Sequence, residues 1–474
     1  MSADTAKQKV YKPRPVTGFP EWLPEVRLVE QQWFDHIRRV FESYGFCSIE
    51  TPSVEELDVL RAKGEVDKEI YVLERLHKDE NDTSDARLAL HFDQTVPLAR
   101  YVAQNFNDLV FPFKRYQMQR VWRGERPQKG RFREFYQCDI DVIGVDALPI
   151  HFDAEMPAIM WEVMSGLPGM ENEKIQMRIS NRKILLGYLA ALNIPTKDGS
   201  TTKLSEALKA QILREIDKLE KLGEAIVLSR IEESGLHDGL GFGLDGFIPP
   251  FLKICQTKFS NSSDLHEALT MSADIDTSNS MLREGIEELS FVLDALAHLP
   301  KGAVVADLSI VRGLDYYTGT VYETVFLEDP GYGSICSGGR YDDLAGSYIN
   351  KHLPGVGISV GFSRLFARMV DQGKIDVSRK SPADVMVMMP HEDKRPAITQ
   401  LCQKLRARGL RVEMFHAAKK FPDQLKYASR KGIPYVWITE EDGTYQVKNM
   451  LTSEQVKADP ATWTPEGRKI DEAA

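Results

Sequence analysis

The stretch RGERPQKGRFREFYQCDIDV, residues 123–142, decides most of what the sequence predicts about the fold. Residues 132–143 read as a strand, and side chains alternate across a strand, so Gln137, Asp139 and Asp141 should share one face. Such a polar face could simply be the solvated side of a sheet. The preceding loop, residues 123–131, adds four cations. These cations would lie above the polar face of the strand. Such an arrangement favours a site that binds phosphate groups.

A second strand with an unusual pattern is predicted at 355–362. In GVGISVGFSR, residues 355–364, all five odd positions from 355 to 363 are Gly or Ser and all four even positions are apolar. One face would be buried and the other nearly bare, so a flat ligand could lie close to the backbone. Close packing of a helix would explain the small residues equally well. Arg364 begins a helical pattern, and its guanidinium is expected at the rim of the bare face.

Two shorter motifs combine glycine turns with Arg and Tyr. They are VRGLDYYTG, residues 311–319, and SGGRYD, residues 337–342. Pairs of tyrosines are more often part of a core or an interface than of a binding site. Each motif alone is therefore a weak signal.

Length and composition limit the classes of protein to consider. The chain has 474 residues, of which 42% are hydrophobic and 27% charged, so several domains are expected. No apolar run approaches the roughly 18 residues that cross a bilayer, which predicts a soluble protein. Residues 1–15 show neither a secretory signal nor a transit helix, so the cytoplasm is the expected compartment. The five cysteines stand singly, which argues against disulfides and structural zinc and favours buried, reduced thiols.

The charge is distributed unevenly along the chain. A net charge of −10 argues weakly against a polyanionic partner. However, residues 114–133 hold eight basic residues against one acidic residue, and residues 404–431 hold nine against two. Either basic patch could be an ordinary solvated surface, and each could also contact nucleic-acid phosphates.

The remaining pattern predicts an α+β protein. A helix over 25–44 ends at Tyr44-Gly45, and a strand over 46–50 runs into Thr51-Pro52. Further strands are expected at 303–311 and 320–326, which together predict a mainly antiparallel sheet flanked by helices. Residues 204–231 carry one long helical stripe of apolar residues.

These patterns predict four segments in the chain. Residues 1–180 and 301–375 would form two parts of one sheet domain, and residues 181–300 a helical insertion between them. Residues 381–474 follow an exposed linker and alternate strand, helix, strand, helix and strand. The last segment should therefore be a small βαβαβ domain.

Taken together, these residues resemble the histidyl-tRNA synthetase family, which belongs to the class II aminoacyl-tRNA synthetases. Residues 44–52 resemble motif 1 of that class, residues 123–141 motif 2, and residues 357–364 motif 3. The segments 312–317 and 338–342 resemble two histidine motifs peculiar to the family. Residues 381–474 resemble its anticodon-binding domain. Ser359 and Ser363 depart from the usual motif 3, which bears on the fine positioning of ATP.

The resemblance implies a histidine–tRNA ligase. ATP would activate L-histidine to an adenylate, and the histidyl group would then pass to the 3′ end of its tRNA. Three arginines would be catalytic: Arg123 and Arg364 at the ATP phosphates and Arg312 at the α-phosphate, with Gly361 also at ATP. Mg²⁺ would neutralise the triphosphate, and no protein side chain is assigned to it. A homodimer formed through motif 1 is also implied.

The resemblance further implies how histidine and tRNA are held. Asp141 and Tyr317 would contact the imidazole nitrogens, with Tyr316 and Tyr341 in the same pocket. Asp93, Thr95 and Gln137 would hold the amino group. The loop residues Gln128, Lys129 and Arg131 would meet the acceptor end of tRNA.

Two other activities are compatible with this fold. A non-catalytic regulatory subunit of ATP phosphoribosyltransferase would sense histidine, although such paralogues generally lack the anticodon-binding domain. An ammonia-dependent asparagine synthetase would leave both histidine motifs and the basic C-terminal segment unexplained. Histidine-dependent exchange of pyrophosphate into ATP would separate these alternatives from the ligase.

Overall fold

The chain divides into two units in the computed structural model, which describes residues 11–61, 69–77, 87–128, 130–195, 201–237, 247–270, 278–311, 316–343, 345–346 and 348–466. The first, here called the large unit, comprises Met1–Pro20 and His36–Met369. The second, the C-terminal unit, comprises Glu21–Asp35 and Val370–Ala474. Each unit is described by itself.

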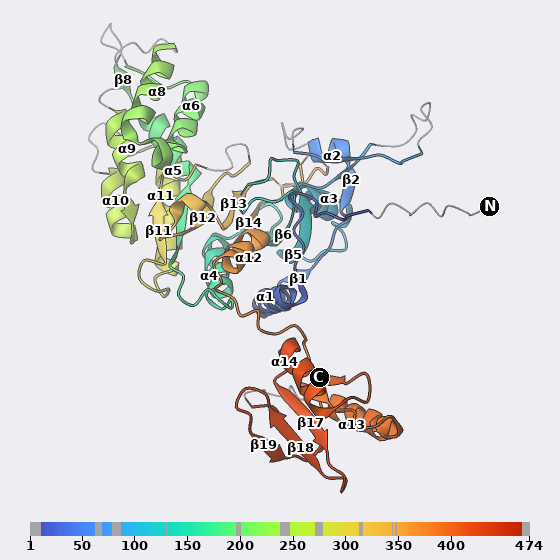
Figure 1. Ribbon diagram of the computed structural model, residues 1–474. Helices are drawn as coiled ribbons and strands as arrows, with labels where there is room; N and C mark the ends of the chain where they lie inside the picture. The colour runs from blue at the N-terminus through green and yellow to red at the C-terminus, as the bar shows by residue number, and fades with distance from the viewer. Residues whose placement is uncertain are drawn as a thin grey trace, which may run out of the picture. The chain divides into compact units, whose positions relative to one another are not determined.

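The N-terminal part of the chain supplies the first strands of the main sheet (Figure 1). Its elements are α1 (Pro24–Ser43), β1 (Cys47–Ser48), β2 (Val54–Glu56), α2 (Leu57–Arg61), β3 (Val72–Leu73), β4 (Leu88–Leu90), α3 (Thr95–Gln104), β5 (Phe113–Trp122), β6 (Glu134–Ile143), α4 (His151–Ser165) and β7 (Ile175–Asn181). As predicted, the first helix ends just before Tyr44-Gly45, and Gly45 has a φ of 78° that favours glycine.

The main sheet has nine strands in the order β1-β5-β6-β14-β13-β12-β7-β11-β10. Its remaining elements are β10 (Lys258–Phe259), β11 (Val304–Asp307), β12 (Thr320–Phe326), η1 (Pro330–Tyr332), β13 (Cys336–Tyr341), β14 (Gly355–Val360) and α12 (Phe362–Asp371). Only the pairs β1–β5 and β7–β11 are parallel among the neighbouring strands of this sheet. The prediction of a mainly antiparallel α+β fold is therefore confirmed.

Between β7 and β11 the described chain is mostly helical (Figure 1). The elements are α5 (Arg182–Ala191), β8 (Ile194–Pro195), β9 (Thr201–Thr202), α6 (Glu206–Ile216), α7 (Leu219–Leu222), α8 (Glu224–His237), α9 (Ile248–Gln256), α10 (Ser262–Thr270) and α11 (Ser280–Ala295). The single long helix predicted at 204–231 is wrong, because the chain breaks after Ile216 and again at Gly223, where φ is 80°. After the second break, the helix turns different sequence positions toward the core. Val227 is therefore buried and Ile226 is exposed.

The main sheet has one apolar face and one polar face. Cys138, Ile140 and Val142 of β6 are fully buried, and α4 packs against β14. Burial of these apolar side chains stabilises the sheet by roughly 25 cal/mol for each Å² removed from water. The opposite face is polar and lies where the sequence placed the candidate site.

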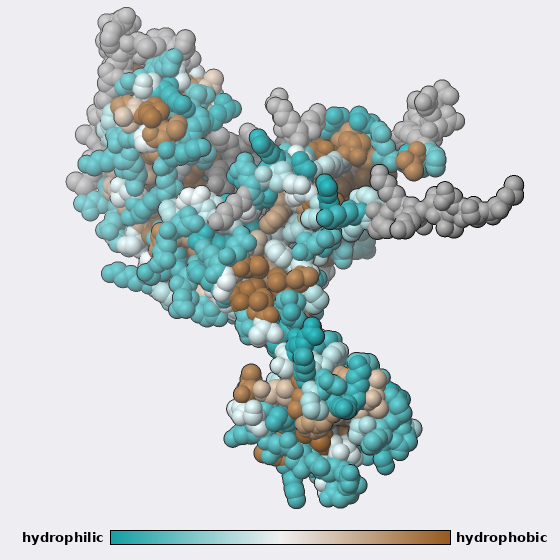
Figure 2. Space-filling view, viewed as in Figure 1, coloured by the Kyte–Doolittle hydropathy of each residue, from teal (hydrophilic) through white to brown (hydrophobic). Residues whose placement is uncertain are grey.

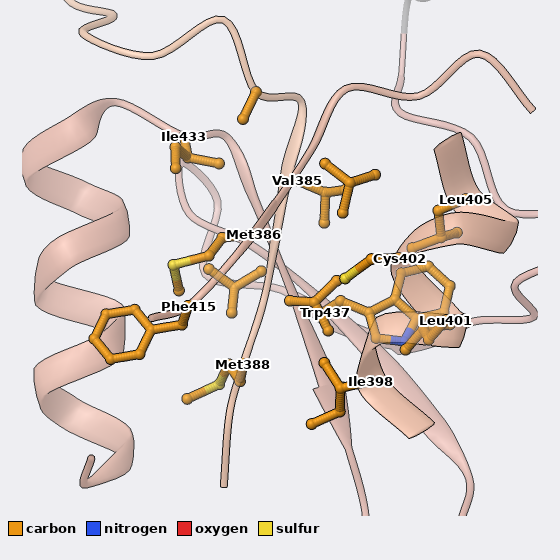
Figure 3. Close-up of a cluster of buried hydrophobic side chains, with 14 of the residues drawn as sticks. Val385, Met386, Met388, Ile398, Leu401, Cys402, Leu405, Phe415, Ile433 and Trp437 are labelled. Atoms are coloured by element: carbon orange, nitrogen blue, oxygen red, sulfur yellow. The ribbon is translucent and has the colours of Figure 1, made fainter. Parts of the chain in front are cut away.

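The C-terminal unit contains a five-stranded sheet in the order β16-β15-β17-β18-β19. Its elements are β15 (Val385–Val387), η2 (Glu392–Lys394), α13 (Arg395–Ala407), β16 (Val412–Met414), α14 (Phe421–Lys431), β17 (Tyr435–Thr439), β18 (Tyr445–Asn449) and β19 (Gln455–Lys457). Trp437, Phe415 and Cys402 pack in its core (Figure 3). The predicted βαβαβ pattern is present, and two antiparallel strands extend it.

The cysteines and the surface complete the description. All five cysteines are free, and four are buried as predicted, but Cys47 is exposed because it lies on the short edge strand β1.

The visible face of the molecule is mostly hydrophilic, with small apolar patches (Figure 2). Among the described residues, no helix is both long enough and apolar enough to span a membrane.

Candidate functional site

Strand register gathers the polar residues of the site on one face of the main sheet. Asp141 of β6 lies opposite Arg115 of β5 on one side and Gly357 of β14 on the other. Gly357 in turn lies opposite Gly339 of β13. Residues opposite each other in a ladder point to the same face, so this register builds the site.

A small pocket of about 40 Å³ lies on this face. It is lined by Thr95, Asp139, Asp141, Tyr316, Tyr317, Ser337, Gly338, Tyr341, Gly357, Ile358 and Ser359. The volume corresponds to a few water molecules, since one water-sized sphere occupies about 10–15 Å³. The pocket can therefore hold part of a small molecule but not a nucleotide. Five of the seven residues predicted to bind histidine line it.

Asp141 is held by two partners inside the small pocket. Arg115 places Nη2 2.5 Å from Oδ2 of Asp141, and both side chains are buried. The hydroxyl of Tyr341 donates a hydrogen bond of 3.0 Å to Oδ1 of Asp141. The sequence did not point to Arg115, because its pairing with Asp141 depends on which strands become neighbours.

The glycines of β14 make room for these side chains. A Cβ at Gly357 would collide with the Asp141 carboxylate, and a Cβ at Gly355 would collide with the Tyr341 ring. The bare face is therefore partly filled by side chains of neighbouring strands, and the part of it at Gly357 and Ser359 lines the small pocket. Ser359 lines this small pocket and also a second, larger pocket beside it.

Two tyrosines of the small pocket, Tyr317 and Tyr341, keep their protons. Burial raises the pKa of both Tyr317 and Tyr341 well above the usual value, and the nearby Asp141 carboxylate raises both further. The rings of Tyr316 and Tyr317 lie 4.1 Å apart between centroids. Neutral phenols can donate hydrogen bonds, so these hydroxyls suit a ligand with acceptor atoms.

Asp139 is a second buried carboxyl group of the small pocket. Burial raises its pKa to about 7, an effect that Arg115 and a hydrogen bond with Ser359 partly oppose. Within the described part of the chain, no group makes a hydrogen bond with its Oδ1. The alternation in residues 132–143 placed Asp139 on the polar face, but no sequence motif assigned it a role.

A larger pocket of about 270 Å³ adjoins the small one. It is lined by Arg123, Glu125, Gly130, Arg131, Phe132, Phe135, Gln137, Ser334, Ile335, Cys336, Ser337, Ser359, Gly361 and Arg364. Ser337 and Ser359 also line the small pocket, so the two spaces share a wall. Three guanidinium groups on one pocket suit a polyphosphate ligand.

Two of the three arginines of the larger pocket, Arg123 and Arg364, are fixed by the surrounding chain. Nε of Arg123 donates to the Phe92 carbonyl at 3.1 Å, and its guanidinium lies 5.2 Å from the centre of the Phe135 ring. Nη2 of Arg364 donates to the Tyr332 carbonyl, and its guanidinium lies 4.8 Å from the Tyr332 ring centre. Such fixed cations cost little reorganisation when charge develops nearby.

Several predicted residues lie outside the two pockets or at their edge. Asp93 lines neither pocket, and its Oδ1 accepts from the Val96 amide near the start of α3. Gln137 lines only the larger pocket, where its Nε2 donates to Ser359 at 2.8 Å. Gln128 is exposed in a turn that it closes with Arg131. Arg312 and Lys129 lie outside the described residues.

The basic segment of the C-terminal unit separates into two groups. Arg406 and Arg408 donate to main-chain carbonyls, and Arg411 pairs with Asp384. In contrast, the lysines around the start of α14 are exposed: Lys419, Lys420 and Lys426. Lys404 and Arg430 of the same segment are exposed as well. All of these exposed cations can meet a polyanion.

Comparison with known proteins agrees with this geometry. Residues 18–365 match the family described as histidyl-tRNA synthetase, and residues 384–462 match the anticodon binding domain. A histidine–tRNA ligase from Thermobifida fusca is 51% identical over 97% of this chain and 99% of its own length. The crystal structure of histidyl-tRNA synthetase from Nostoc sp. PCC 7120 aligns with a TM-score of 0.80 at 36% identity, covering 95% of this chain and 97% of that one.

A more distant structure shares the fold alone. It is a protein from Bacillus halodurans C described as an ATP phosphoribosyltransferase regulatory subunit/histidyl-tRNA synthetase, with 19% identity, a TM-score of 0.64 and coverage of 88% of this chain and 97% of that one. The close relatives match nearly the full length, including the C-terminal unit. On the strength of these matches, the chain belongs to the histidyl-tRNA synthetase family.

Proposed function

We propose that this chain acts as a histidine–tRNA ligase and that its two adjoining pockets divide the substrates. The larger pocket takes ATP, and the small pocket takes the histidine side chain. The observation that carries the proposal is the shared wall of Ser337 and Ser359, which places a pocket lined by arginines beside one lined by carboxyl and phenol groups. The reacting groups of the two substrates would meet at this wall.

In the first step, a carboxylate oxygen of histidine attacks the α-phosphorus of ATP, and the bond to pyrophosphate breaks. Negative charge develops on the non-bridging oxygens, so fixed cations lower the barrier. Arg123 and Arg364 line the ATP pocket and would hold the phosphates. We assign the α-phosphate to Arg312 from the family motif alone.

Mg²⁺ would enter with ATP and neutralise part of the triphosphate charge. Glu125 is the acidic residue of the larger pocket, and its Oε2 lies 3.7 Å from Nη1 of Arg131. One carboxylate beside a triphosphate fits an ion that takes most of its ligands from phosphate and water. Glu125 would hold the ion there.

The small pocket would select histidine by satisfying both imidazole nitrogens. The Asp141 carboxylate can accept from one ring N–H, and the neutral Tyr317 hydroxyl can donate to the other nitrogen. Analogues that leave either group unpaired would be rejected, because a buried unpaired polar group costs about 1–3 kcal/mol. Tyr316 and Tyr341 line the same pocket.

The amino group would lie toward the wall between the pockets. Thr95 lines the small pocket and Gln137 the larger one, so both can reach it. Asp93 would act at longer range, because the Val96 amide already occupies one of its oxygens. Asp139 lines the small pocket close to the same group and is an additional candidate.

In the second step, the terminal ribose hydroxyl of tRNA attacks the adenylate carbonyl and AMP leaves. The turn formed by Gln128 and Arg131 would meet the acceptor end, together with Lys129. The exposed lysines near α14 would meet the phosphates of the anticodon region.

We also propose a homodimer through motif 1. The strand β1 pairs in parallel with β5, where Cys47 lies opposite Arg115. An interface on this edge would lie next to the strand that carries the buried partner of Asp141. Light scattering at micromolar concentration should give twice the mass of the chain, and an active monomer would contradict the proposal.

Pyrophosphate exchange into ATP, measured with and without histidine beside charging of total tRNA, tests the activity. The proposal predicts exchange that depends on histidine, and charging of histidine tRNA alone. Histidine binding without exchange would instead indicate a histidine sensor. The same reactions with asparagine provide the control for another ligase of the same fold.

A further inference from the structure

Tyr332, at the end of η1, lines neither pocket but contacts two residues that line the larger one. Its hydroxyl donates a hydrogen bond of 2.8 Å to the main-chain carbonyl of Arg364. Nη2 of Arg364 donates back to the Tyr332 carbonyl. The guanidinium of Arg364 also lies 4.8 Å from the centre of the Tyr332 ring, within the range of a cation–π contact. Tyr332 therefore fixes both the main chain and the side chain of Arg364.

The same hydroxyl is packed against the motif 2 loop. A Cβ at Gly130 would collide with the Tyr332 hydroxyl, so the loop backbone approaches this oxygen closely. Gly130 has a φ of 70° and lies in the turn closed by hydrogen bonds between Gln128 and Arg131, of 3.2 Å and 2.9 Å. Glycine is needed here both for this φ and for the close approach. The position of the turn thus depends on the Tyr332 hydroxyl.

The ring of Tyr332 has a second anchor that does not involve the loop. Arg368, one helical turn after Arg364, places its guanidinium 4.7 Å from the Tyr332 ring centre. Arg368 also pairs with Asp329 at 2.6 Å. The ring is therefore held by α12, while the hydroxyl donates to Arg364 of α12 and also lies against the loop at Gly130. One side chain thus contacts two different parts of the site.

We propose that Tyr332 is a positioning residue that ties the acceptor-end turn to the ATP arginine Arg364. The inference rests on the proposed function of the two pockets. The ring positions the Arg364 guanidinium for formation of the adenylate. The hydroxyl sets the turn at Gly130 for transfer to tRNA. A shift of the turn when tRNA binds would consequently reach Arg364 through this side chain.

The test separates the ring from the hydroxyl with two variants. Tyr332→Phe removes the hydroxyl, with its hydrogen bond to the Arg364 main-chain carbonyl, but keeps both contacts with the Arg364 guanidinium. Because the guanidinium contacts remain, we expect exchange to slow by no more than about twofold while transfer to tRNA falls about fivefold or more. Tyr332→Leu removes both the ring and the hydroxyl, so the KM for ATP in exchange should also rise about fivefold, as loss of a cation–π contact allows. Single-turnover transfer from preformed adenylate measures the second step alone.

A double-mutant cycle tests the contact with the turn directly. Gly130→Ala should lower transfer because its Cβ meets the hydroxyl. In the Tyr332→Phe background the same change should cost less, because the oxygen nearest to the added Cβ is gone and the ring carbon Cζ, at 2.9 Å, is the closest atom that remains. Additive losses in the cycle would overturn the proposal.

Arg368→Met is the matched control, because it removes the other cation on the same ring and lines neither pocket. It should lower the melting temperature without changing the ratio of transfer to exchange. If Tyr332→Phe behaves like Arg368→Met, or slows both steps equally, Tyr332 has only a structural role. Absence of exchange in the parental chain would instead contradict the proposed function itself.

Discussion

The two pockets of the large unit are built in different ways, although they share a wall. The small pocket lies on the sheet, and its key contact joins Arg115 and Asp141 of neighbouring strands at 2.5 Å in a buried setting. The larger pocket is lined in part by the loop residues Glu125, Gly130 and Arg131, and its cations at Arg123 and Arg364 are held by carbonyl groups and aromatic rings. The first arrangement is rigid and suits selection of a small side chain. The second suits a large, charged ligand that enters and leaves.

Loss of an ATP arginine should produce the largest effect on activity. Arg364→Ala should lower the rate of pyrophosphate exchange about 10²-fold or more, because a fixed donor at the developing charge is removed. The KM for histidine should change much less, and unfolding should stay cooperative. Arg312→Ala should behave similarly if it reaches the α-phosphate. Exchange at the parental rate in either variant would remove that arginine from the proposed mechanism.

Asp141 should affect histidine and not ATP, but the substitution must respect its buried partner. Asp141→Ala would leave the Arg115 cation buried and unpaired, which typically costs 3–5 kcal/mol of stability. Asp141→Asn also removes the counter-charge of Arg115, but it keeps the shape and an oxygen that can accept from the guanidinium, so it should cost less stability than Asp141→Ala. The KM for histidine should rise about 10-fold or more while the KM for ATP changes little. Urea unfolding of both variants separates lost binding from lost folding. Equal losses for both ligands would show that Asp141 only supports the strand.

Asp139 should make stability depend on pH in an unusual direction. Its pKa in the folded chain is about 7, above the ordinary value of 3.8, so the folded state binds more protons between these values. The free energy of unfolding should therefore fall as the pH rises from about 4 to about 7. Asp139→Asn remains neutral and should gain roughly 1–4 kcal/mol relative to the parent over this window. Identical pH slopes for the two proteins, measured by urea unfolding, would show that Asp139 ionises normally.

The C-terminal lysines should produce the smallest effect and leave exchange intact. Replacing Lys419, Lys420 and Lys426 by Gln should weaken tRNA binding and reduce the slope of log K against log salt by roughly 2, as loss of about three phosphate contacts predicts. Lys457→Gln, on the edge strand β19, is the control. An unchanged slope would remove this group of lysines from the tRNA surface.

The sequence could predict what depends on local alternation. The strand at 132–143 placed Gln137, Asp139 and Asp141 on one face, and the glycine pattern of 355–364 marked the neighbouring strand. Pairing between strands lies beyond local pattern, which is why Arg115 was missed. The carboxylate of Asp93 illustrates another limit. A carboxylate just before a helix can cap that helix or bind a ligand, and here it accepts from the Val96 amide.

Some helices and strands were also predicted wrongly or missed because local pattern was not enough. The apolar stripe at 204–231 predicted one helix, because periodicity alone does not show where the chain turns. At Gly223, where φ is 80°, one helix ends and the next helix begins with its apolar positions shifted. The strands β18 and β19 were missed because Tyr445–Asn449 and Gln455–Lys457 carry mostly polar side chains, and β19 is the edge strand of their sheet.

The division of substrates between the pockets is tested most directly by equilibrium binding to two variants. Calorimetry with histidine and with a non-hydrolysable ATP analogue should be run on the parent, Arg364→Ala and Asp141→Asn. We predict that each variant loses affinity for a different ligand. Arg364→Ala should bind the nucleotide alone more weakly, and Asp141→Asn should bind histidine alone more weakly. Equal loss of both ligands in both variants, with folding intact, would contradict this prediction.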